Sequence, residues 1–373
     1  MLLPTLSYLT DVYFGFGSVE TLPDLLERFG LSRPLVVTDP DLVAVGILER
    51  PGMDDAPVFD GVQTNPTEAQ VLDGLARYRE AGCDGMVAVG GGSSIDLAKC
   101  VGMLVHHPEP FEQYAMRRGG VSRITDRVPP LIAVPTTAGT GSEVGRAALV
   151  TLASGDKVGF LSPHLLPVAA LCDPELTLSM PPRLTAATGM DAISHCVEAY
   201  CSPRYNPVAD AIALDGLVRG CGHIATATEQ GSDLTSRSEM MMCALEGGLA
   251  FQKGLGAVHS LSHPLGGLAG KRLHHGTLNA LFLPPVLRFN IDHCVEKMDE
   301  MARRLNLQRG ADLPGFFEDL NRRLGLPRSL SETGVTAKDL EPLAQKAVND
   351  HCTSTNPRPL GLDACRALYR EVL

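Results

Sequence analysis

The chain has 373 residues, of which 44% are hydrophobic, and a formal net charge of -11 with no block of Lys or Arg. This charge argues against a surface for nucleic acid or an anionic membrane, and no apolar run approaches the length of a membrane span. The length predicts one large or two ordinary domains. We expect a cytoplasmic protein, because no signal peptide is recognisable and the ten cysteines show no paired CxxC spacing.

The run Leu35-Val36-Val37-Thr38-Asp39 predicts a parallel strand buried on both faces. An acidic residue just past such a strand is where a nucleotide-binding sheet contacts the ribose hydroxyls. Asp39 therefore becomes a candidate cofactor-binding residue. A turn-forming Asp before Pro40 explains the same residue equally well.

Thr67 and Gln70 have the spacing of a capping box, in which each side chain bonds to the backbone of the other residue. This motif predicts a helix that starts after Thr67 and runs to about Ala81. Gly82 then ends the helix in the usual C-terminal manner.

Residues 85–99 follow the order strand, glycine turn and helix. Gly90, Gly91 and Gly92 let the backbone approach a ligand closely, and Ser93 opens a helix whose free N–H groups favour a pyrophosphate. The run is neither a Walker loop nor the GxGxxG fingerprint. We interpret it as a phosphate cradle rather than a purely structural turn, because a strand precedes it and a helix follows.

A further strand, 131–134, leads into the loop 135–144, which is dense in hydroxyls and glycines. Such a loop can give several hydrogen bonds to a polar ligand without bulk. Residues 150–173 are expected to add further strands to the sheet, with Lys157 between them. The alternation of strands and helices up to this point predicts a parallel α/β sheet that binds ligands at its strand ends.

From Pro181-Pro182 onward, the chain has few strand-like runs and indicates a succession of helices. We therefore predict an α/β domain over 1–180 and an all-helical domain over 181–373. The expected helices cover about 183–200, 206–220, 232–252, 256–268, 276–290, 293–305, 311–324, 337–348 and 362–372.

Asp191 and His195 are four residues apart in a run of good helix formers. On a helix this spacing puts both side chains on one face, where a carboxylate and an imidazole can bind one divalent metal. Two ligands are too few for a complete site. Four further histidines gather within seventeen positions downstream, which favours a metal or catalytic site over isolated core histidines: His259, His263, His274 and His275.

Together with the motifs described above, these histidines indicate a resemblance to a known family over nearly the whole chain. The chain is similar to the iron-containing (group III) alcohol dehydrogenase family. The motifs that carry the resemblance are Gly90-Gly91-Gly92-Ser93 with Asp96 and Lys99, Pro135 to Glu143, Gly189-Met190-Asp191-Ala192 with His195 and Glu198, His259-x-x-x-His263, His275-Gly276 before Asn279, and Thr355-Asn356-Pro357-Arg358.

The resemblance implies a Rossmann-like dinucleotide-binding domain and an all-α, dehydroquinate synthase-like metal-binding domain. It implies a catalytic role in proton transfer for His263. The family's metal ligands fall on Asp191, His195, His259 and His275, although His274 leaves the last position open; Gly276 favours His275. The implied cofactor-binding residues are Asp39, Gly91, Gly92, Ser93, Asp96, Thr136, Thr137, Thr140 and Lys157.

The resemblance further implies an NAD-dependent, metal-dependent oxidoreductase that interconverts a small alcohol and its aldehyde or ketone. Asp39 favours NAD over NADP, and Fe(II) is the expected metal, with Zn(II) as the alternative. The family also suggests a homo-oligomer, commonly a dimer. Two other functions stay open, a maleylacetate reductase-like enzyme and a dehydroquinate synthase-like lyase, and the complete Asp/His ligand set argues against the first. The sequence does not indicate which alcohol or carbonyl compound is the substrate.

Overall fold

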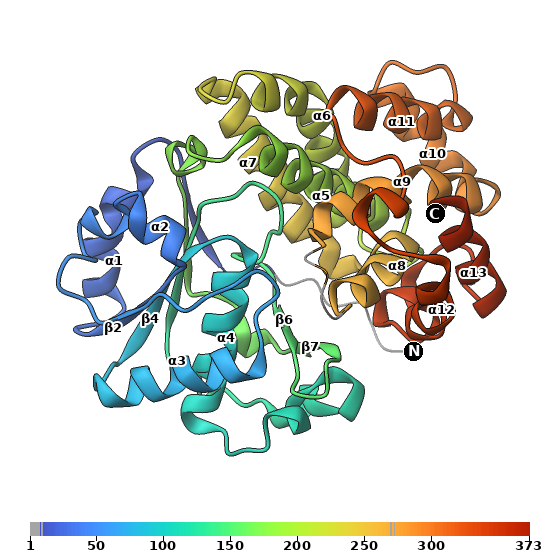
Figure 1. Ribbon diagram of the computed structural model, residues 1–373. Coiled ribbons are helices and arrows are strands. Elements are labelled where there is room, and N and C mark those ends of the chain that lie inside the picture. The colour runs from blue at the N-terminus through green and yellow to red at the C-terminus, as the bar shows by residue number, and fades with distance from the viewer. Residues whose placement is uncertain (1–7, 9, 269–270, 272) are drawn as a thin grey trace. The chain divides into compact units, whose positions relative to one another are not determined.

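The computed structural model describes Tyr8, residues 10–268, Lys271 and residues 273–373 (Figure 1). Its residues pack as two compact units. One unit comprises Tyr8–Thr137 and Ser142–Leu178, and the other comprises Ala138–Gly141 and Ser179–Leu373. Among the described residues, no helix is both long and apolar enough to cross a membrane.

The first unit is built on a six-stranded sheet in which all paired strands are parallel. This arrangement confirms the predicted α/β fold class. In spatial order the strands are β1 (Asp11–Phe14), β8 (Ala169–Cys172), β5 (Leu131–Pro135), β4 (Gly85–Gly90), β2 (Pro34–Val37) and β3 (Val58–Phe59).

Alternate residues of the central strands enter two separate cores, because successive side chains of a strand point to opposite faces. In β4, Met86 and Ala88 join one core, whereas Val87 and Val89 join the other. Burial on both faces explains why these strands are continuous apolar runs. The helices of this unit are α1 (Leu22–Arg28), α2 (Pro40–Ala44), α3 (Glu68–Glu80) and α4 (Gly92–His106).

The predicted capping box is confirmed at the start of α3. The backbone N–H of Gln70 donates to Thr67 Oγ1 over 3.4 Å, and the backbone N–H of Thr67 donates to Gln70 Oε1 over 3.0 Å. The helix ends at Glu80, and Gly82 follows with a φ of 64°. The local sequence was sufficient to predict this helix start, because Thr67 and Gln70 lie within one helical turn of each other.

Only one of the three strands between residues 147 and 172 joins the parallel sheet. That strand is β8, whereas β6 (Ala147–Thr151) and β7 (Lys157–Leu161) pair with each other as an antiparallel hairpin. Of the additions to the sheet expected over residues 150–173, β8 is therefore confirmed, whereas the strands around Lys157 do not join the sheet. A short turn between two strands favours antiparallel pairing, since parallel strands need a long crossover.

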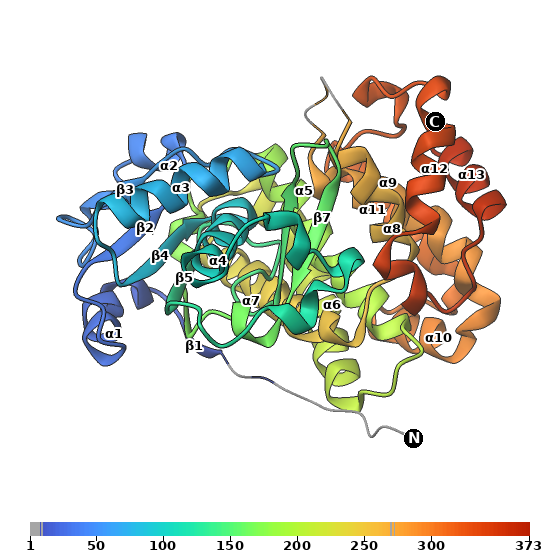
Figure 2. The same cartoon turned by 90° about the horizontal axis from the view of Figure 1, so that it is seen from below.

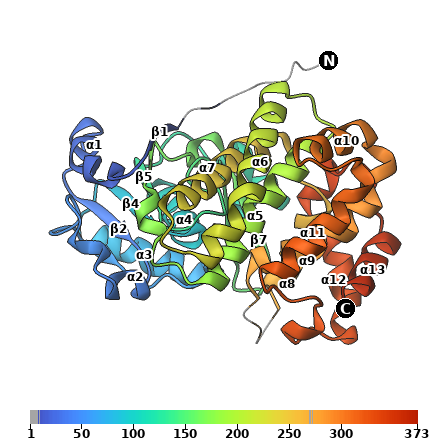
Figure 3. The ribbon, with the colours of Figure 1, turned by 90° about the horizontal axis from the view of Figure 1, so that it is seen from above.

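The second unit is helical, as predicted, and α5, α6 and α7 lie side by side in it (Figure 3). Helices α12 and α13 also pack together (Figure 2). The helices are α5 (Pro182–Cys201), α6 (Pro207–Glu229), α7 (Leu234–Ala250), α8 (Ala257–Gly266), α9 (His275–Asn290), α10 (Val295–Arg304), α11 (Leu313–Arg323), α12 (Leu340–Val348) and α13 (Leu362–Glu371).

Helix α6 is longer than predicted, because it continues past Gly220 to Glu229. The glycine does not end the helix; it is a packing contact. A β-carbon at Gly220 would lie 2.6 Å from Cys243 Sγ and 2.7 Å from a side-chain carbon of Ile193. The absence of a side chain at this position thus lets α6 approach α5 and α7 closely.

Candidate functional site

The two loops predicted to bind the cofactor lie against each other in the first unit. Gly91 precedes α4, and a β-carbon on it would lie 3.2 Å from Thr137 Oγ1. The backbone N–H of Thr136 donates to the carbonyl of Gly90 over 3.0 Å. The first turn of α4, where Gly92 and Ser93 lie, carries no acidic residue. The N–H groups at this helix start therefore suit an anion such as a pyrophosphate.

Asp96 lies in α4 behind this loop, and both of its carboxylate oxygens accept hydrogen bonds from the chain. Ser142 Oγ donates to Oδ1 over 2.6 Å, and the backbone N–H of Leu149 donates to Oδ2 over 2.9 Å. Lys99, one turn further along α4, donates to the carbonyls of Ser142 and Gly145, each over 2.7 Å. In this structure, Asp96 and Lys99 therefore hold the end of the second loop and the backbone that follows it.

The other predicted cofactor residues lie at separate places. Asp39 lies two residues after the end of β2 and is the N-cap of α2. Its Oδ1 accepts a hydrogen bond from the backbone N–H of Leu42 over 3.0 Å. Lys157 begins β7, and its ammonium donates to Asn65 Oδ1 over 2.8 Å. Thr140 belongs to the short piece Ala138–Gly141, which groups with the helical unit.

Glu143 is a buried carboxylate beside the second loop, and its burial gives a testable pH dependence. Burial raises the pKa of Glu143 from 4.5 to about 7, even though the Lys99 ammonium acts to lower it. A folded-state pKa above the unfolded value favours folding at low pH, and this contribution is lost as the pH rises through that window. We expect Glu143→Gln to match the parent near pH 4.5 and to exceed its stability by about 1–3 kcal/mol at about pH 8.

Thermal unfolding at both pH values measures this effect. The control is Glu80→Gln, because the Glu80 side chain is 77% exposed. If Glu143→Gln destabilises the protein equally at both pH values, the ionised carboxylate is not what limits stability above neutrality.

Four predicted metal ligands meet inside the helical unit. Asp191 and His195 lie one turn apart on α5, His259 lies on α8, and His275 begins α9. The Nε2 atoms of the three histidines each lie 3.7 Å from Asp191 Oδ1. Ligand bonds of about 2.0–2.2 Å would place tetrahedral donors roughly 3.3–3.6 Å apart. The ligand atoms of Asp191, His195 and His259 all lie within 4.8 Å of one another, whereas His275 joins them through its 3.7 Å separation from Asp191 Oδ1. The donor set fits one divalent cation once His275 closes on the other two histidines.

Close packing of α9 on α5 brings His275 to this cluster. A β-carbon at Gly276 would lie 2.0 Å from the carbonyl oxygen of Ala187 and 3.1 Å from Asp191 Cβ. Only a glycine lets the start of α9 approach α5 this closely. His274 is the residue just before α9, so His275 is the histidine whose Nε2 faces Asp191.

Glu198 orients His259 from one turn beyond His195 on α5. Its Oε2 lies 2.5 Å from His259 Nδ1, and its Oε1 accepts from the backbone N–H of Val258 over 2.7 Å. Asn356 Oδ1 accepts from the neighbouring N–H of Ala257 over 3.0 Å. The side chains of Glu198 and Asn356 thus accept hydrogen bonds from the free backbone N–H groups at the start of α8. Because Glu198 binds Nδ1 of His259, the Nε2 atom of this ring faces Asp191.

Asn279, one turn after His275 on α9, also faces the cluster. Its Nδ2 lies 2.6 Å from Asp191 Oδ1 and 3.1 Å from Nε2 of both His259 and His275. Its Oδ1 is buried and has no hydrogen-bond partner among the described residues. An unsatisfied oxygen beside this donor set is a further feature that suits a cation.

The charges of the cluster are strongly coupled. Burial alone would raise the pKa of Asp191, but His195, His275 and His259 together lower it well below its ordinary value. Burial lowers the pKa of His195 to about 4. Burial also opposes protonation of His259, but the hydrogen bonds to Asp191 and Glu198 raise its pKa to about 9. An ionised carboxylate and neutral imidazoles are the forms that bind a metal.

His263 lies beside the cluster, one turn after His259. Its ring stacks on that of His275, with centroids 5.3 Å apart and planes 10° apart. Its Nδ1 lies 3.0 Å from Oδ2 of Asp350, a residue that the sequence interpretation missed. Asp350 is 87 positions away, so only the adjacent ligand-type residues Asp350-His351-Cys352 could have drawn attention to it.

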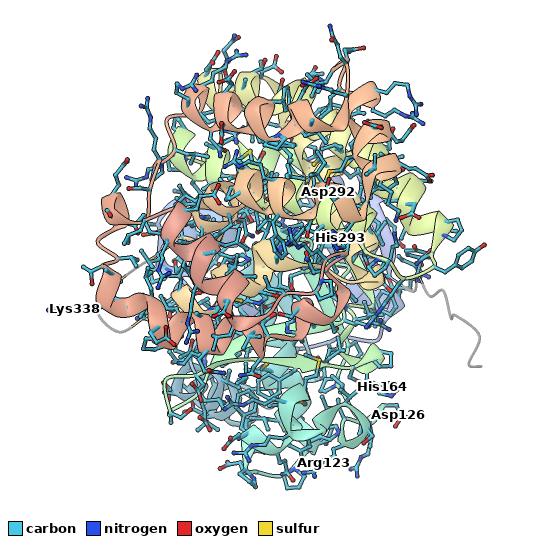
Figure 4. The ribbon with its side chains drawn as sticks, turned by 90° about the vertical axis from the view of Figure 1, so that its right-hand side faces the viewer. Arg123, Asp126, His164, Asp292, His293 and Lys338 are labelled. Atoms are coloured by element: carbon cyan, nitrogen blue, oxygen red, sulfur yellow. The ribbon has the colours of Figure 1, made fainter. Side chains whose placement is uncertain are left out.

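Not every histidine joins this arrangement. His293, beside Asp292 in the turn Ile291–His293, is exposed (Figure 4). His164, in the turn Pro163–Leu165 of the first unit, is labelled in the same view. His293 therefore provides a control position that shares the unit but not the cluster.

The chain thus holds a parallel α/β sheet in one unit and a cluster of one Asp and three His in the helical unit. The chain matches the family described as iron-containing alcohol dehydrogenase over residues 10–174. It also matches the C-terminal part of the Fe-containing alcohol dehydrogenase family over residues 185–373. The chain belongs to the iron-containing alcohol dehydrogenase family and is an oxidoreductase, as the resemblance implied.

Individual relatives cover nearly the whole chain. A 4-hydroxybutyrate dehydrogenase from Cupriavidus necator is 52% identical over 98% of this chain and 98% of its own length. An NAD-dependent methanol dehydrogenase from Bacillus methanolicus is 34% identical over 92% and 93%, respectively. The solved structure of a 1,3-propanediol oxidoreductase superposes with a TM-score of 0.93, at 34% identity and with 99% and 100% coverage.

Proposed function

We propose that this protein is an NAD-dependent, metal-dependent dehydrogenase of a short primary alcohol that carries a carboxylate, with 4-hydroxybutyrate as the substrate. The observation that carries the reaction class is the meeting of Asp191 Oδ1 with the Nε2 atoms of three histidines at 3.7 Å. The substrate rests on the 52% identical 4-hydroxybutyrate dehydrogenase. The predicted Fe(II) and the predicted NAD preference belong to the same proposal.

Asp191, His195, His259 and His275 would hold the metal, and Glu198 fixes the tautomer of His259 that leaves Nε2 free to bind. Oxidation of a primary alcohol releases one hydride and one proton. When bound, the divalent cation supplies positive charge that favours the alkoxide, and NAD supplies the hydride acceptor. His263 carries the proton toward solvent, and Asp350 holds its ring by the bond to Nδ1.

Reduction of NAD with matched alcohols tests the substrate and the reaction class. We expect kcat/KM for 4-hydroxybutyrate to exceed that for 1-butanol by at least about tenfold, or about 1.4 kcal/mol, because 1-butanol lacks the carboxylate of the compound that the 52% identical relative is named for. A chelator should abolish turnover of both alcohols. Equal rates with the two alcohols would remove the carboxylate from the proposal, and no turnover with any alcohol or aldehyde would remove the reaction class.

Replacement of Asp39 tests the cofactor preference. The carboxylate lies just past β2 and would repel the 2′-phosphate of NADP. We expect Asp39→Gly to improve kcat/KM for NADPH relative to NADH by about tenfold, since like charges near the protein surface cost about 1–2 kcal/mol. Asp41→Asn, in the first turn of α2, is the control. An unchanged cofactor ratio in Asp39→Gly would remove the role of Asp39.

Replacement of Glu198 tests the orientation of His259. In Glu198→Gln, the amide oxygen still accepts from Val258, but the NH2 group faces His259 Nδ1 and favours the tautomer protonated on Nε2. We expect metal affinity to fall by about 10–100-fold while the fold is retained. Competitive chelator titration measures the affinity, with the exposed Glu296→Gln as control. Unchanged affinity would mean that Glu198 supports only the helix start.

A further inference from the structure

A second group of side chains of the metal-ligand type includes His263, whose ring stacks on those of both His275 and His351. The group comprises His263 on α8 together with Asp350, His351 and Cys352. Each residue offers one ligand atom, and all four atoms lie within 4.8 Å of one another. Asp350 is the N-cap of the 3-10 turn His351–Thr355, so one short turn presents three of the four ligands.

The measured separations are close to those of a tetrahedral site. His263 Nδ1 lies 3.0 Å from Asp350 Oδ2, and His351 Nε2 lies 3.4 Å from Cys352 Sγ. Bonds of about 2.0–2.3 Å to nitrogen, oxygen and sulfur would require ligand separations of roughly 3.3–3.8 Å. Since all four ligand atoms lie within 4.8 Å of one another, a closure of at most about 1 Å would complete the site.

The surroundings hold the group in place and leave one side open. Asp350 Oδ1 accepts from the backbone N–H of Cys352 over 2.9 Å, which ties the carboxylate and the thiol to the same turn. The rings of His263 and His351 stack, with centroids 5.6 Å apart and planes 15° apart. Cys352 is 2% exposed, whereas the side chain of His351 is 43% exposed. His351 is thus the side from which an ion can enter.

We propose that His263, Asp350, His351 and Cys352 form a second site for a thiophilic divalent cation of the zinc class, separate from the Asp191 cluster. Two imidazoles, one carboxylate and one thiolate are a ligand set that suits Zn(II). The Asp191 cluster contains no sulfur, so the two sites differ in chemistry.

Binding at this second site releases one proton, from the Cys352 thiol, to solvent. The thiolate is the form of cysteine that ligates a metal, so the thiol proton leaves when the cation binds. The Nδ1 proton of His263 moves to Nε2, because Nδ1 becomes a ligand. The occupied site therefore removes His263 from proton transfer. This inhibitory consequence, unlike the binding itself, depends on the proposed function.

Cobalt substitution tests the second site without any substrate. Full-length protein loaded at the Asp191 cluster is titrated with Co(II), and the near-ultraviolet thiolate-to-cobalt charge-transfer band is recorded. We expect one additional Co(II) per chain with this band, and the same band in Asp191→Ala. The band should disappear in Cys352→Ser, and Co(II) affinity should fall at least about tenfold in His351→Ala. His293→Ala, exposed and outside both groups, should behave as the parent.

A parent protein that shows no thiolate band, or a band that persists in Cys352→Ser, would overturn the second site. His351→Ala replaces an exposed side chain, so it keeps the test decisive if Cys352→Ser fails to fold. In a parallel assay, added Zn(II) should inhibit the parent but not His351→Ala. A confirmed band without inhibition would keep the site and instead contradict the role of His263.

Discussion

Asp191→Ala is expected to lose the bound metal and the dehydrogenase activity together. Asp191 Oδ1 is the one donor that lies 3.7 Å from the Nε2 atoms of His195, His259 and His275, and it carries the negative charge of the set. Without it, only the three imidazoles remain as ligands, and none of them carries a negative charge. We expect kcat/KM to fall by at least about 10³-fold, because a bound cation stabilises the developing alkoxide by several kcal/mol.

Metal content by elemental analysis and NAD reduction with 4-hydroxybutyrate measure the two losses. Asp292→Ala, at an exposed carboxylate of the same unit (Figure 4), is the control and should keep both. NADH binding, followed by its fluorescence, should persist in Asp191→Ala because Gly91, Gly92, Ser93, Thr136 and Thr137 belong to the other unit. Full activity in a metal-free preparation of Asp191→Ala would contradict the metal's role in the reaction.

Gly276→Ala is expected to damage the metal centre although it removes no ligand. The added methyl group would lie 2.0 Å from the carbonyl oxygen of Ala187, which is backbone of α5 and cannot rotate away. The start of α9 must therefore move, and His275 moves with it. We expect a loss of about 1–3 kcal/mol in stability and at least about tenfold weaker metal binding.

The matched control is Gly222→Ala, because a β-carbon at Gly222 on α6 would meet nothing within 4 Å. This control should be neutral or more stable by up to about 1 kcal/mol, since alanine favours a helix interior. Thermal unfolding and chelator competition separate the two effects. If Gly276→Ala binds metal as tightly as the parent, the close contact of α9 with α5 does not position His275.

Much of the fold could be predicted because its signals are local. Apolar runs buried on both faces identified β2, β4 and β5, and the capping box identified the start of α3. The separate pairing of β6 with β7 could not be read in this way, because their alternating burial resembles that of any half-buried strand. The extension of α6 through Gly220 depends on the side chains of α5 and α7, which lie far away in sequence.

The sequence by itself determined the ligand types of the candidate metal centre, since Asp191 and His195 share a helical face by their spacing alone. The resemblance implied His259 and His275 as the other ligands, but only the tertiary structure shows how they reach Asp191. The packing of α9 on α5 brings His275 to this carboxylate, and the carboxylate of Glu198 orients His259 across 61 positions. The same holds for the contact of Asp350 with His263 across 87 positions. Helical periodicity operates within one element, whereas these contacts depend on how whole helices approach each other.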